Sequence, residues 1–296
     1  MPEITVIANC QSLVIGEALA LCGHDIDVSF IDVNFLNDPA TAAKVARLQV
    51  SGPDTLAVTV PLSAAFGPLE TTELKALLGD RLATMTNLFF GGLHPDITYL
   101  GAMGARIPAV MGDYHSRLAL FGYVTGRGKA DTMALFAPQA LQRAGYMDIF
   151  GESAAELRRR DEGLDLRLAE PFLAMTREVH SMFTVNHPTA PPVLHLARMI
   201  LGWFGLPHTA HGPLLLPNHL VNNYVWPVHD ALAEAHGLAW RTPLAFVRAN
   251  QPRGRSMDLA GFVAASFGAY DMAGREQMRE AVEAMDFFVP MAQALG

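Results

Sequence analysis

Residues 1–80 alternate short apolar runs with segments of helical periodicity. Runs with the length and composition of buried strands lie at 4–9, 28–33 and 55–62. Apolar residues at helical spacing mark the segments 11–22, 40–50 and 72–78. Strands separated by helices pair in parallel, because the helix carries the chain back to the edge where the next strand begins. The sequence therefore predicts an α/β fold, with a parallel sheet and flanking helices in the N-terminal half.

The pattern changes after residue 113 and becomes mostly helical. Before that point, 83–101 is expected to be a strand that runs into a Gly-Gly turn. Helical or amphipathic segments are expected at 116–126, 138–146, 153–160, 171–184, 191–205 and from 275 onward. Ser153 and Glu156 have capping-box spacing, and Pro290 predicts a kink. We therefore expect a Rossmann-like or SGNH-like core over 1–113 and a helix-rich portion over 114–296, packed together as one continuous globular unit.

A turn of sequence Asn9-Cys10-Gln11 joins the first predicted strand to the first predicted helix. In α/β proteins the carboxyl ends of the strands face the crevice where ligands bind. The helix turns unpaired N–H groups and its positive dipole end toward the same point, which biases a thiol there toward thiolate. Asn9 and Gln11 flank the thiol with amide donors. Cys10 is therefore a candidate catalytic residue, and a small buried cysteine after a strand is the structural alternative.

Two histidine clusters have both a chemical and a structural interpretation. In His94-Pro95-Asp96, the carboxylate either orients an imidazole that shuttles protons or caps the next segment of a turn. In Asn186-His187-Pro188-Thr189, the histidine is a second candidate for the same role, while Thr189 has the position of a helix cap. The residues alone leave both interpretations open.

A third cluster, Tyr114-His115-Ser116, precedes a predicted helix. The free N–H groups of that helix, the Ser116 hydroxyl and the charge of Arg117 form a candidate anion-binding site. The structural alternative is that Ser116 simply caps the helix.

The composition excludes several classes of function. The 296 residues are 51% hydrophobic and carry a formal charge of -8, so we expect no nucleic-acid partner. No apolar run is long enough to span a membrane and no signal peptide is recognised, so we expect a cytoplasmic protein without membrane insertion. Cys10 and Cys22 lie too far apart along the predicted helix to form a disulfide. Neither metal-binding patterns nor P-loop and GxGxxG patterns occur at the turns, so we predict no metal site and no nucleotide site of those kinds.

Five ordered segments carry a family resemblance: ANCQ at 8–11, FFGGLHPD at 89–96, YHS at 114–116, ELRRRD at 156–161 and NHPT at 186–189. In this order the chain resembles the WcbI family of capsular polysaccharide biosynthesis proteins over about its first 205 residues. The resemblance implies a coenzyme A-binding acetyltransferase that O-acetylates a sugar of the capsule. It places the family's cysteine and glutamine at Cys10 and Gln11, and its three histidine motifs at His94, His115 and His187.

The resemblance and the turn together predict a mechanism of acyl transfer. We expect Cys10, as a thiolate, to take an acetyl group from acetyl-CoA and pass it to a sugar hydroxyl. Gln11 and local backbone N–H groups would form the oxyanion hole. His94 is the first candidate for the base, followed by His187 and then His115. The expected partners are acetyl-CoA and a sugar or polysaccharide-precursor acceptor, and a homo-oligomer is compatible with the sequence.

Binding of coenzyme A also requires local positive charge for its phosphates. Arg117, Arg127 and Lys129 are the basic group proposed for this contact. The run 158–160 is interpreted as a solvated helix end, with contact to phosphates as the alternative. The other candidates for substrate or cofactor binding are Asn9, Asp96, Tyr114, His115, Ser116 and Asn186. Two alternatives stay open: a Cys-dependent SGNH-like esterase or deacetylase, in which water replaces the sugar, and a non-catalytic protein that binds coenzyme A or carbohydrate.

Overall fold

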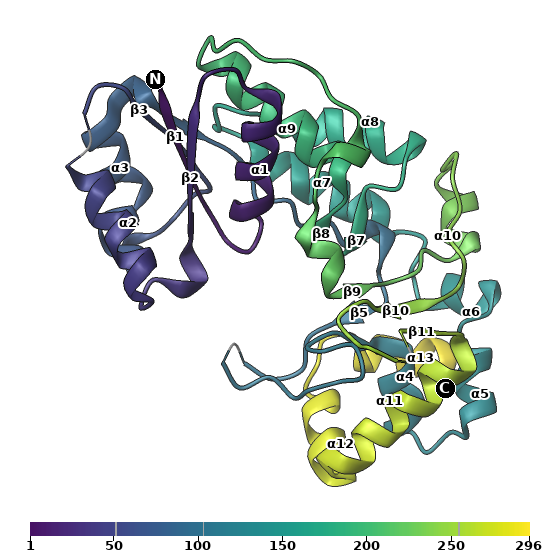
Figure 1. The fold of residues 1–296 in the computed structure, drawn as a ribbon. Coiled ribbons are helices and arrows are strands. Elements are labelled where there is room, and N and C mark those ends of the chain that lie inside the picture. Colours follow the sequence, from purple (N-terminus) through teal and green to yellow (C-terminus); the bar gives the residue numbers. More distant parts are fainter. Residues whose placement is uncertain (51, 103, 254) are drawn as a thin grey trace. The chain divides into compact units, whose positions relative to one another are not determined.

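The computed structural model describes residues 1–50, 52–102, 104–253 and 255–296 (Figure 1). The chain divides into two compact units, each assembled from several stretches. The first unit comprises 1–89, 155–181 and 187–220, and the second comprises 90–154, 182–186 and 221–296. The boundary expected near residue 113 thus falls inside the second unit.

A four-stranded parallel sheet organises the first unit and confirms the predicted α/β class. Its strands are β1 (Glu3–Ala8), β2 (Asp27–Asp32), β3 (Thr55–Thr59) and β4 (Leu82–Thr84). Their order is β2-β1-β3-β4, and each neighbouring pair is parallel. The chain moves from β1 to β2 on one side and then crosses back to β3 on the other. The sheet therefore has a topological switch point between β1 and β3, where α/β proteins bind ligands.

Helices cover both faces of this sheet. The helices of the first unit are α1 (Ser12–Cys22), α2 (Pro39–Gln49), α3 (Thr71–Leu78), α8 (Ala169–Glu178) and α9 (Ala190–Trp203), with 3-10 turns η1 (Val33–Phe35), η2 (Ala64–Leu69), η3 (Gly79–Arg81) and η5 (Pro213–Leu215), and the short strand β8 (His187–Pro188). Figure 1 shows α1 on one side of the sheet, with α2 and α3 on the other. Val14 and Leu19 of α1 are buried, as are Ile4 and Val6 of β1. This apolar layer is the core that fixes the start of α1 at the end of β1.

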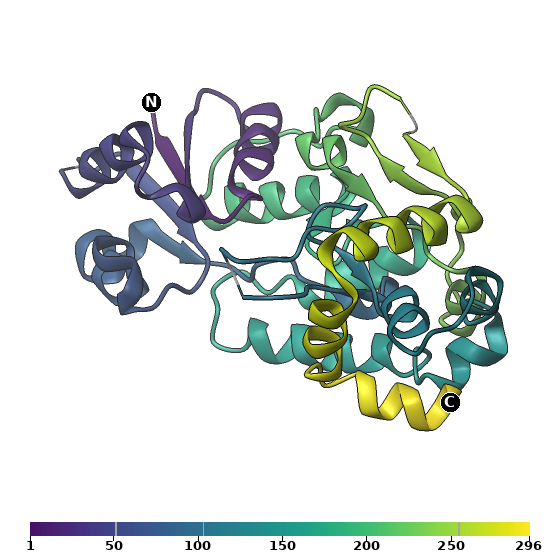
Figure 2. The ribbon, with the colours of Figure 1, turned by 90° about the horizontal axis from the view of Figure 1, so that it is seen from below.

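The second unit is mostly helical. Its helices are α4 (Arg117–Val124), α5 (Lys129–Ala134), α6 (Pro138–Arg143), α10 (Asp230–Ala235), α11 (Leu259–Ala273), α12 (Arg275–Glu283) and α13 (Phe288–Leu295). Its short strands are β5 (Ile97–Thr98), β6 (His115–Ser116), β7 (Met182–Thr184), β9 (Tyr224–Val225), β10 (Phe246–Arg248) and β11 (Ser256–Met257), beside the 3-10 turn η4 (Gly91–Leu93). Helix α7 (Ile149–Asp161) and the 3-10 turn η6 (His219–Asn222) each have residues in both units. The helices α11 to α13 form the yellow C-terminal run in Figure 2.

Four sequence predictions were wrong in detail. The long strand expected over 83–101 is only the end of β4 and the two-residue β5, with the turn η4 between them. Ser153 lies inside α7 rather than at its cap. Pro290 does not kink a helix, because it occupies the first turn of α13, where a missing N–H costs nothing. Helix α11 was not predicted at all.

Helices α1, α2 and α3 begin and end close to their predicted bounds. In the part of the chain that the structure describes, no helix has both the length and the hydropathy needed to cross a membrane.

Candidate functional site

A cavity of about 350 Å³ lies at the carboxyl edge of the sheet in the first unit. It is lined by Asn9, Val33, Val60, Pro61, Thr86, Asn87 and Arg160. Six of these residues follow the ends of the four strands, and two of the four strands, β1 and β3, border the switch point. The cavity therefore has both the location and the size of a ligand site in an α/β protein.

The Asn9-Cys10-Gln11 turn is fixed by hydrogen bonds within it. The Asn9 side-chain Oδ1 accepts the N–H of Gln11 at 3.1 Å, and the Asn9 carbonyl accepts the N–H of Ser12 at 2.8 Å. These two bonds satisfy donors that the first turn of α1 leaves without intrahelical partners. The result is a tight entry into the helix, which holds Cys10 in place at the end of β1.

Gln11 connects this turn to the segment after β4. Its side-chain Nε2 donates to the Leu88 carbonyl at 2.8 Å, and its Oε1 accepts the Leu88 N–H at 3.3 Å. The side chain is 2% exposed. A buried amide that pairs with both groups of one peptide acts as a clamp. Gln11 thereby holds Thr86 and Asn87, which line the cavity, near the turn.

The thiol of Cys10 is not biased toward thiolate, contrary to the sequence prediction. Burial first, and then the nearby carboxylate of Asp32, raise the pKa of Cys10 from 9.0 to about 11, against a smaller lowering by the backbone N–H of Cys10 itself. The thiol is thus protonated at neutral pH.

Arg160 contributes a charged group that the sequence interpretation assigned to a solvated helix end. Its guanidinium donates to the carbonyl oxygens of Asn87 and Phe89, and its Nε lies 3.6 Å from Glu156. Burial lowers the pKa of Arg160, which still leaves a cation at neutral pH. Among the described residues, the buried Oδ1 of Asn87 has no hydrogen-bond partner. Arg160 and Asn87 therefore present a charge and an amide to the cavity.

The sequence held only a weak signal for these two residues. Asn87 follows an apolar run, as Asn9 does, which is typical of a strand end. Arg160 was present in the run of three arginines, but only the fold shows which of the three turns inward. Arg158 and Arg159 instead form exposed ion pairs with Glu170 and Glu156.

Asp96 is the centre of a buried hydrogen-bond cluster in the second unit. Its Oδ1 accepts the N–H of Leu118 at 3.0 Å and the hydroxyl of Tyr146 at 2.9 Å, while its carbonyl accepts the N–H of Arg117 at 2.8 Å. Ser116 caps α4 through the N–H of Ala119 at 3.0 Å. Burial raises the pKa of Asp96. The second and third motifs thus meet at the start of α4, where Ser116 caps the helix as the structural alternative predicted, and Asp96 binds the first turn of that helix rather than the segment that follows it.

Two of the three candidate histidines donate to backbone carbonyls in the same unit. Nε2 of His94 lies 3.1 Å from the Trp226 carbonyl, and Nε2 of His115 lies 2.8 Å from the Ile107 carbonyl. Since a carbonyl only accepts, each Nε2 carries a hydrogen. Burial lowers the pKa of His115, which keeps that ring neutral.

Tyr114 and Asn186 are also brought together in the second unit. The Tyr114 hydroxyl donates to Asn186 Oδ1 at 2.7 Å, and the Thr184 hydroxyl donates to the same oxygen at 3.1 Å. The residues lie 72 positions apart in the sequence. This contact joins the third motif to the first residue of the fifth.

His187 belongs to the first unit, as do Asn9, Cys10 and Gln11. It is 6% exposed, and burial lowers its pKa from 6.5 to about 4. Its ring is therefore neutral at pH 7. Thr189 is at the cap position of α9, but its hydroxyl donates to the His180 carbonyl at 2.7 Å and does not cap the helix.

Two of the three basic residues proposed for the phosphates, Arg117 and Arg127, have other contacts in the second unit. Arg127 donates to the carbonyl of Leu295, and the guanidinium of Arg117 lies 5.5 Å from the centre of the Phe287 ring. Lys129 is exposed at the start of α5. These contacts bind the C-terminal helix, so the geometry favours Arg160 over this group as a ligand contact. Within the described ranges, no group of three or more His, Cys, Asp or Glu side chains is placed to hold a metal ion.

Comparison with known proteins identifies the family. The family model "Polysaccharide biosynthesis enzyme WcbI" matches residues 3–209. The chain belongs to the WcbI family. No curated protein matches it significantly.

A solved WcbI structure matches the whole fold. It aligns with a TM-score of 0.77 at 14% sequence identity, covering 100% of this chain and 99% of the other. That structure is described as WcbI, a novel polysaccharide biosynthesis enzyme, in its native form without a disulfide bond between coenzyme A and a cysteine. The WcbI fold therefore extends over residues 210–296, beyond the segment that the family model matches.

Proposed function

We propose that this WcbI-family enzyme is a coenzyme A-dependent O-acetyltransferase. It moves an acetyl group from acetyl-CoA to a hydroxyl of a sugar in a capsular or other surface polysaccharide. The observation that carries the proposal is the cavity at the switch point, which is lined by Asn9, the residue directly before Cys10. The description of the similar structure, which mentions coenzyme A and a cysteine, supports coenzyme A as the ligand and Cys10 as the counterpart.

The cavity suits one part of a large ligand. Its volume of about 350 Å³ is at the lower end of the range for small-molecule sites. Arg160 supplies the positive charge that an anionic ligand requires, and Asn87 and Thr86 supply polar groups for orientation. The rest of coenzyme A would extend beyond these residues.

The protonated state of Cys10 constrains the chemistry. In the covalent route, Sγ of Cys10 attacks the thioester carbonyl, its proton passes to a base, and the coenzyme A sulfur leaves and takes up a proton. A sugar hydroxyl then attacks the acyl-enzyme and restores the thiol. Because the pKa of Cys10 is about 11, deprotonation has to accompany attack rather than precede it.

Two histidines remain the proposed bases for this step. His187 is in the same unit as Cys10 and is neutral at pH 7, so its ring is able to accept a proton. His94, the first candidate from the sequence, belongs to the second unit, where its Nε2 donates to the Trp226 carbonyl. Gln11 acts as a positioning residue through its clamp on Leu88, and the oxyanion donors are proposed to include local backbone N–H groups.

Calorimetric titration with coenzyme A and acetyl-CoA is the first test. We expect saturable binding that Arg160→Gln weakens about tenfold or more, whereas Arg159→Gln, an exposed neighbour, leaves it unchanged. Absence of binding to either ligand would reject the proposal. Release of more than one equivalent of free coenzyme A per protein without any sugar acceptor would indicate a hydrolase instead.

Mass spectrometry distinguishes the covalent route from direct transfer. After incubation with acetyl-CoA, we expect the intact protein to gain one acetyl group, and Cys10→Ala to gain none. Cys22→Ser is the matched control, because Cys22 is a buried free thiol at the far end of α1 from Cys10. Full turnover by Cys10→Ala would leave direct transfer to the sugar as the mechanism.

A further inference from the structure

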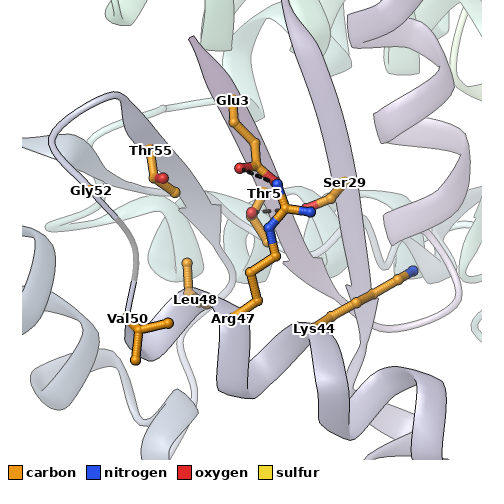
Figure 3. Close-up of a pocket in the computed structure, with 9 residues that line it drawn as sticks. All are labelled: Glu3, Thr5, Ser29, Lys44, Arg47, Leu48, Val50, Gly52 and Thr55. Carbon is orange, nitrogen blue, oxygen red and sulfur yellow. Dashed lines mark hydrogen bonds and ion pairs between the residues drawn. The ribbon is translucent and has the colours of Figure 1, made fainter.

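A second cavity lies at the opposite edge of the same sheet. Its volume is about 330 Å³, and it is lined by Glu3, Thr5, Ser29, Lys44, Arg47, Leu48, Val50, Gly52 and Thr55 (Figure 3). Glu3 is the first residue of β1, whereas Asn9 follows its last. Thr5 is the lining residue of β1 nearest to Asn9, so about 13 Å of strand separates the two cavities. The second cavity is therefore distinct from the proposed catalytic one.

The cavity exists because α2 does not fill the sheet face beneath it. Of the residues of α2, all of which the structure describes, Leu48 alone is buried. The strands present hydroxyl groups at this point, since Thr5 on β1 pairs in register with Ser29 on β2, and Glu3 pairs with Thr55 on β3. Sheet faces under helices are normally apolar. Here the sheet face carries hydroxyl groups and α2 leaves a cavity above it, so the cavity is suited to a polar ligand.

The polar groups in this cavity retain hydrogen-bonding capacity. The hydroxyls of Thr5 and Ser29 share one bond of 2.9 Å, which uses one of their two hydrogens. Arg47 reaches from α2 to Glu3, with Nη2 2.9 Å from Oε2, and Figure 3 marks this ion pair with a dashed line. The Arg47 side chain is 74% exposed and that of Glu3 21% exposed. The Arg47 side chain thus lies on the solvent side of Glu3 and can rotate away from it at little cost, because exposed ion pairs are weak.

The arrangement of donors and acceptors decides the class of ligand. Lys44 already donates to the Phe30 carbonyl at 2.9 Å and lies 3.9 Å from the centre of the Phe30 ring. The deeper charge is the carboxylate of Glu3, which repels anions. A neutral polyol donates to Glu3 and accepts from Arg47 and the hydroxyls, so it uses both partners of the ion pair.

We propose that this second cavity is a saccharide-binding site that holds one sugar unit away from the catalytic centre. The choice of a sugar rather than another polyol rests on the proposed function, in which a sugar is the acceptor. A site of this kind would retain a polysaccharide or its precursor through weak contacts while transfer takes place at the other edge of the sheet.

Nuclear magnetic resonance of the full chain with labelled threonine methyl groups tests the site. Glucose, mannose, galactose and inorganic phosphate are titrated separately while the Thr55 signal is followed. We expect at least one hexose to shift this signal saturably, and phosphate not to shift it. The double variant Thr5→Val with Ser29→Ala should weaken hexose binding at least about tenfold. Removing both hydroxyls together leaves neither without a partner, so the fold is retained.

Thr72→Val is the matched control, because Thr72 is an exposed residue of α3 that does not line the cavity. It should leave hexose binding unchanged. Coenzyme A binding should be equal in the wild type, the double variant and the control. Failure of coenzyme A binding with intact hexose binding would reject the proposed function alone. The saccharide site is rejected if no hexose shifts Thr55 up to about 100 mM, or if phosphate shifts it and no hexose does.

Discussion

The reactivity of Cys10 should report the burial of its thiol. Its pKa of about 11 lies two units above the ordinary 9.0, so at pH 8 the thiolate fraction is about 100-fold lower than for an ordinary thiol. A thiolate of higher pKa is intrinsically more nucleophilic, by about eightfold for two units at a Brønsted coefficient near 0.45. The two effects together predict exchange with a disulfide about tenfold slower than for an unperturbed thiol.

Dithiodipyridine, an uncharged disulfide whose product absorbs light, measures this rate. The Cys22→Ser background leaves Cys10 as the one cysteine of the chain. We expect the logarithm of the rate to rise by about one for each pH unit from 7 to 10, because the thiolate fraction rises tenfold per unit below the pKa. A rate that levels off at or below pH 9 would refute the assignment of the raised pKa to burial.

Asp32→Asn separates the second cause from the first. The carboxylate of Asp32 raises the pKa of Cys10, and asparagine removes that charge while it keeps an oxygen for the N–H of Asn34. The pKa should fall and exchange at pH 8 should become faster. Asp27→Asn is the control, since Asp27 is exposed at the other end of β2. Equal rates in both variants would show that Asp32 does not act on the thiol.

Three further predictions concern stability, each measured by urea denaturation. Asp165→Ala should lower the free energy of unfolding by about 1–3 kcal/mol, because Asp165 Oδ2 accepts both the N–H of Thr84 at 2.8 Å and its hydroxyl at 2.7 Å; an unchanged midpoint would contradict this. Gly122→Ala should lower the free energy of unfolding by about 1–3 kcal/mol, since the new Cβ would lie 2.2 Å from Oγ1 of the buried Thr132. Adding Thr132→Ser to this variant should not restore stability, because serine keeps the clashing hydroxyl. The pKa of His187 is lowered to about 4 in the folded protein, so as the pH falls the histidine takes up a proton in the unfolded chain before it does so in the folded one. Its contribution to the free energy of unfolding is therefore fully present above pH 6.5 and is reduced by up to about 2 kcal/mol as the pH drops to 4.5. His187→Gln should lack this part of the pH dependence, and identical pH profiles would exclude it.

The sequence predicted the first unit well because its signals are local. The first three strands and the helices between them each contain a periodic pattern and a recognisable end, such as Gly23 after α1. The prediction of a strand over 83–101 failed because the apolar residues of this segment are buried without forming a long strand. Leu88, Phe90 and Leu93 are all buried, although none of them is in a strand. An apolar run shows that a segment is buried, but not which element covers it.

The candidate site was predicted in position but not in its chemical state. A turn at the end of a strand is visible in the sequence, so Asn9, Cys10 and Gln11 were placed correctly at the carboxyl edge of the sheet. The partner of Gln11 lies 77 residues away, and the contacts of Arg160 lie more than 70 residues away. The pKa of a thiol depends on such distant neighbours and on burial. Local sequence therefore cannot supply it.

The ordered motifs of the family serve two kinds of purpose in this fold. Asp96 and Ser116 accept hydrogen bonds from the first backbone N–H groups of α4. These bonds stabilise the start of the helix whether or not catalysis occurs. The residues around Cys10 instead determine the pKa of its thiol. If coenzyme A occupies the cavity as proposed, its negative charge will raise the pKa of Cys10 above the value for the free protein. Arg160 is the cation among the residues that line this cavity, so it opposes that rise. Its replacement should therefore slow acyl transfer to the thiol by more than the loss of coenzyme A affinity explains, and a fall in kcat at saturating acetyl-CoA would measure the difference.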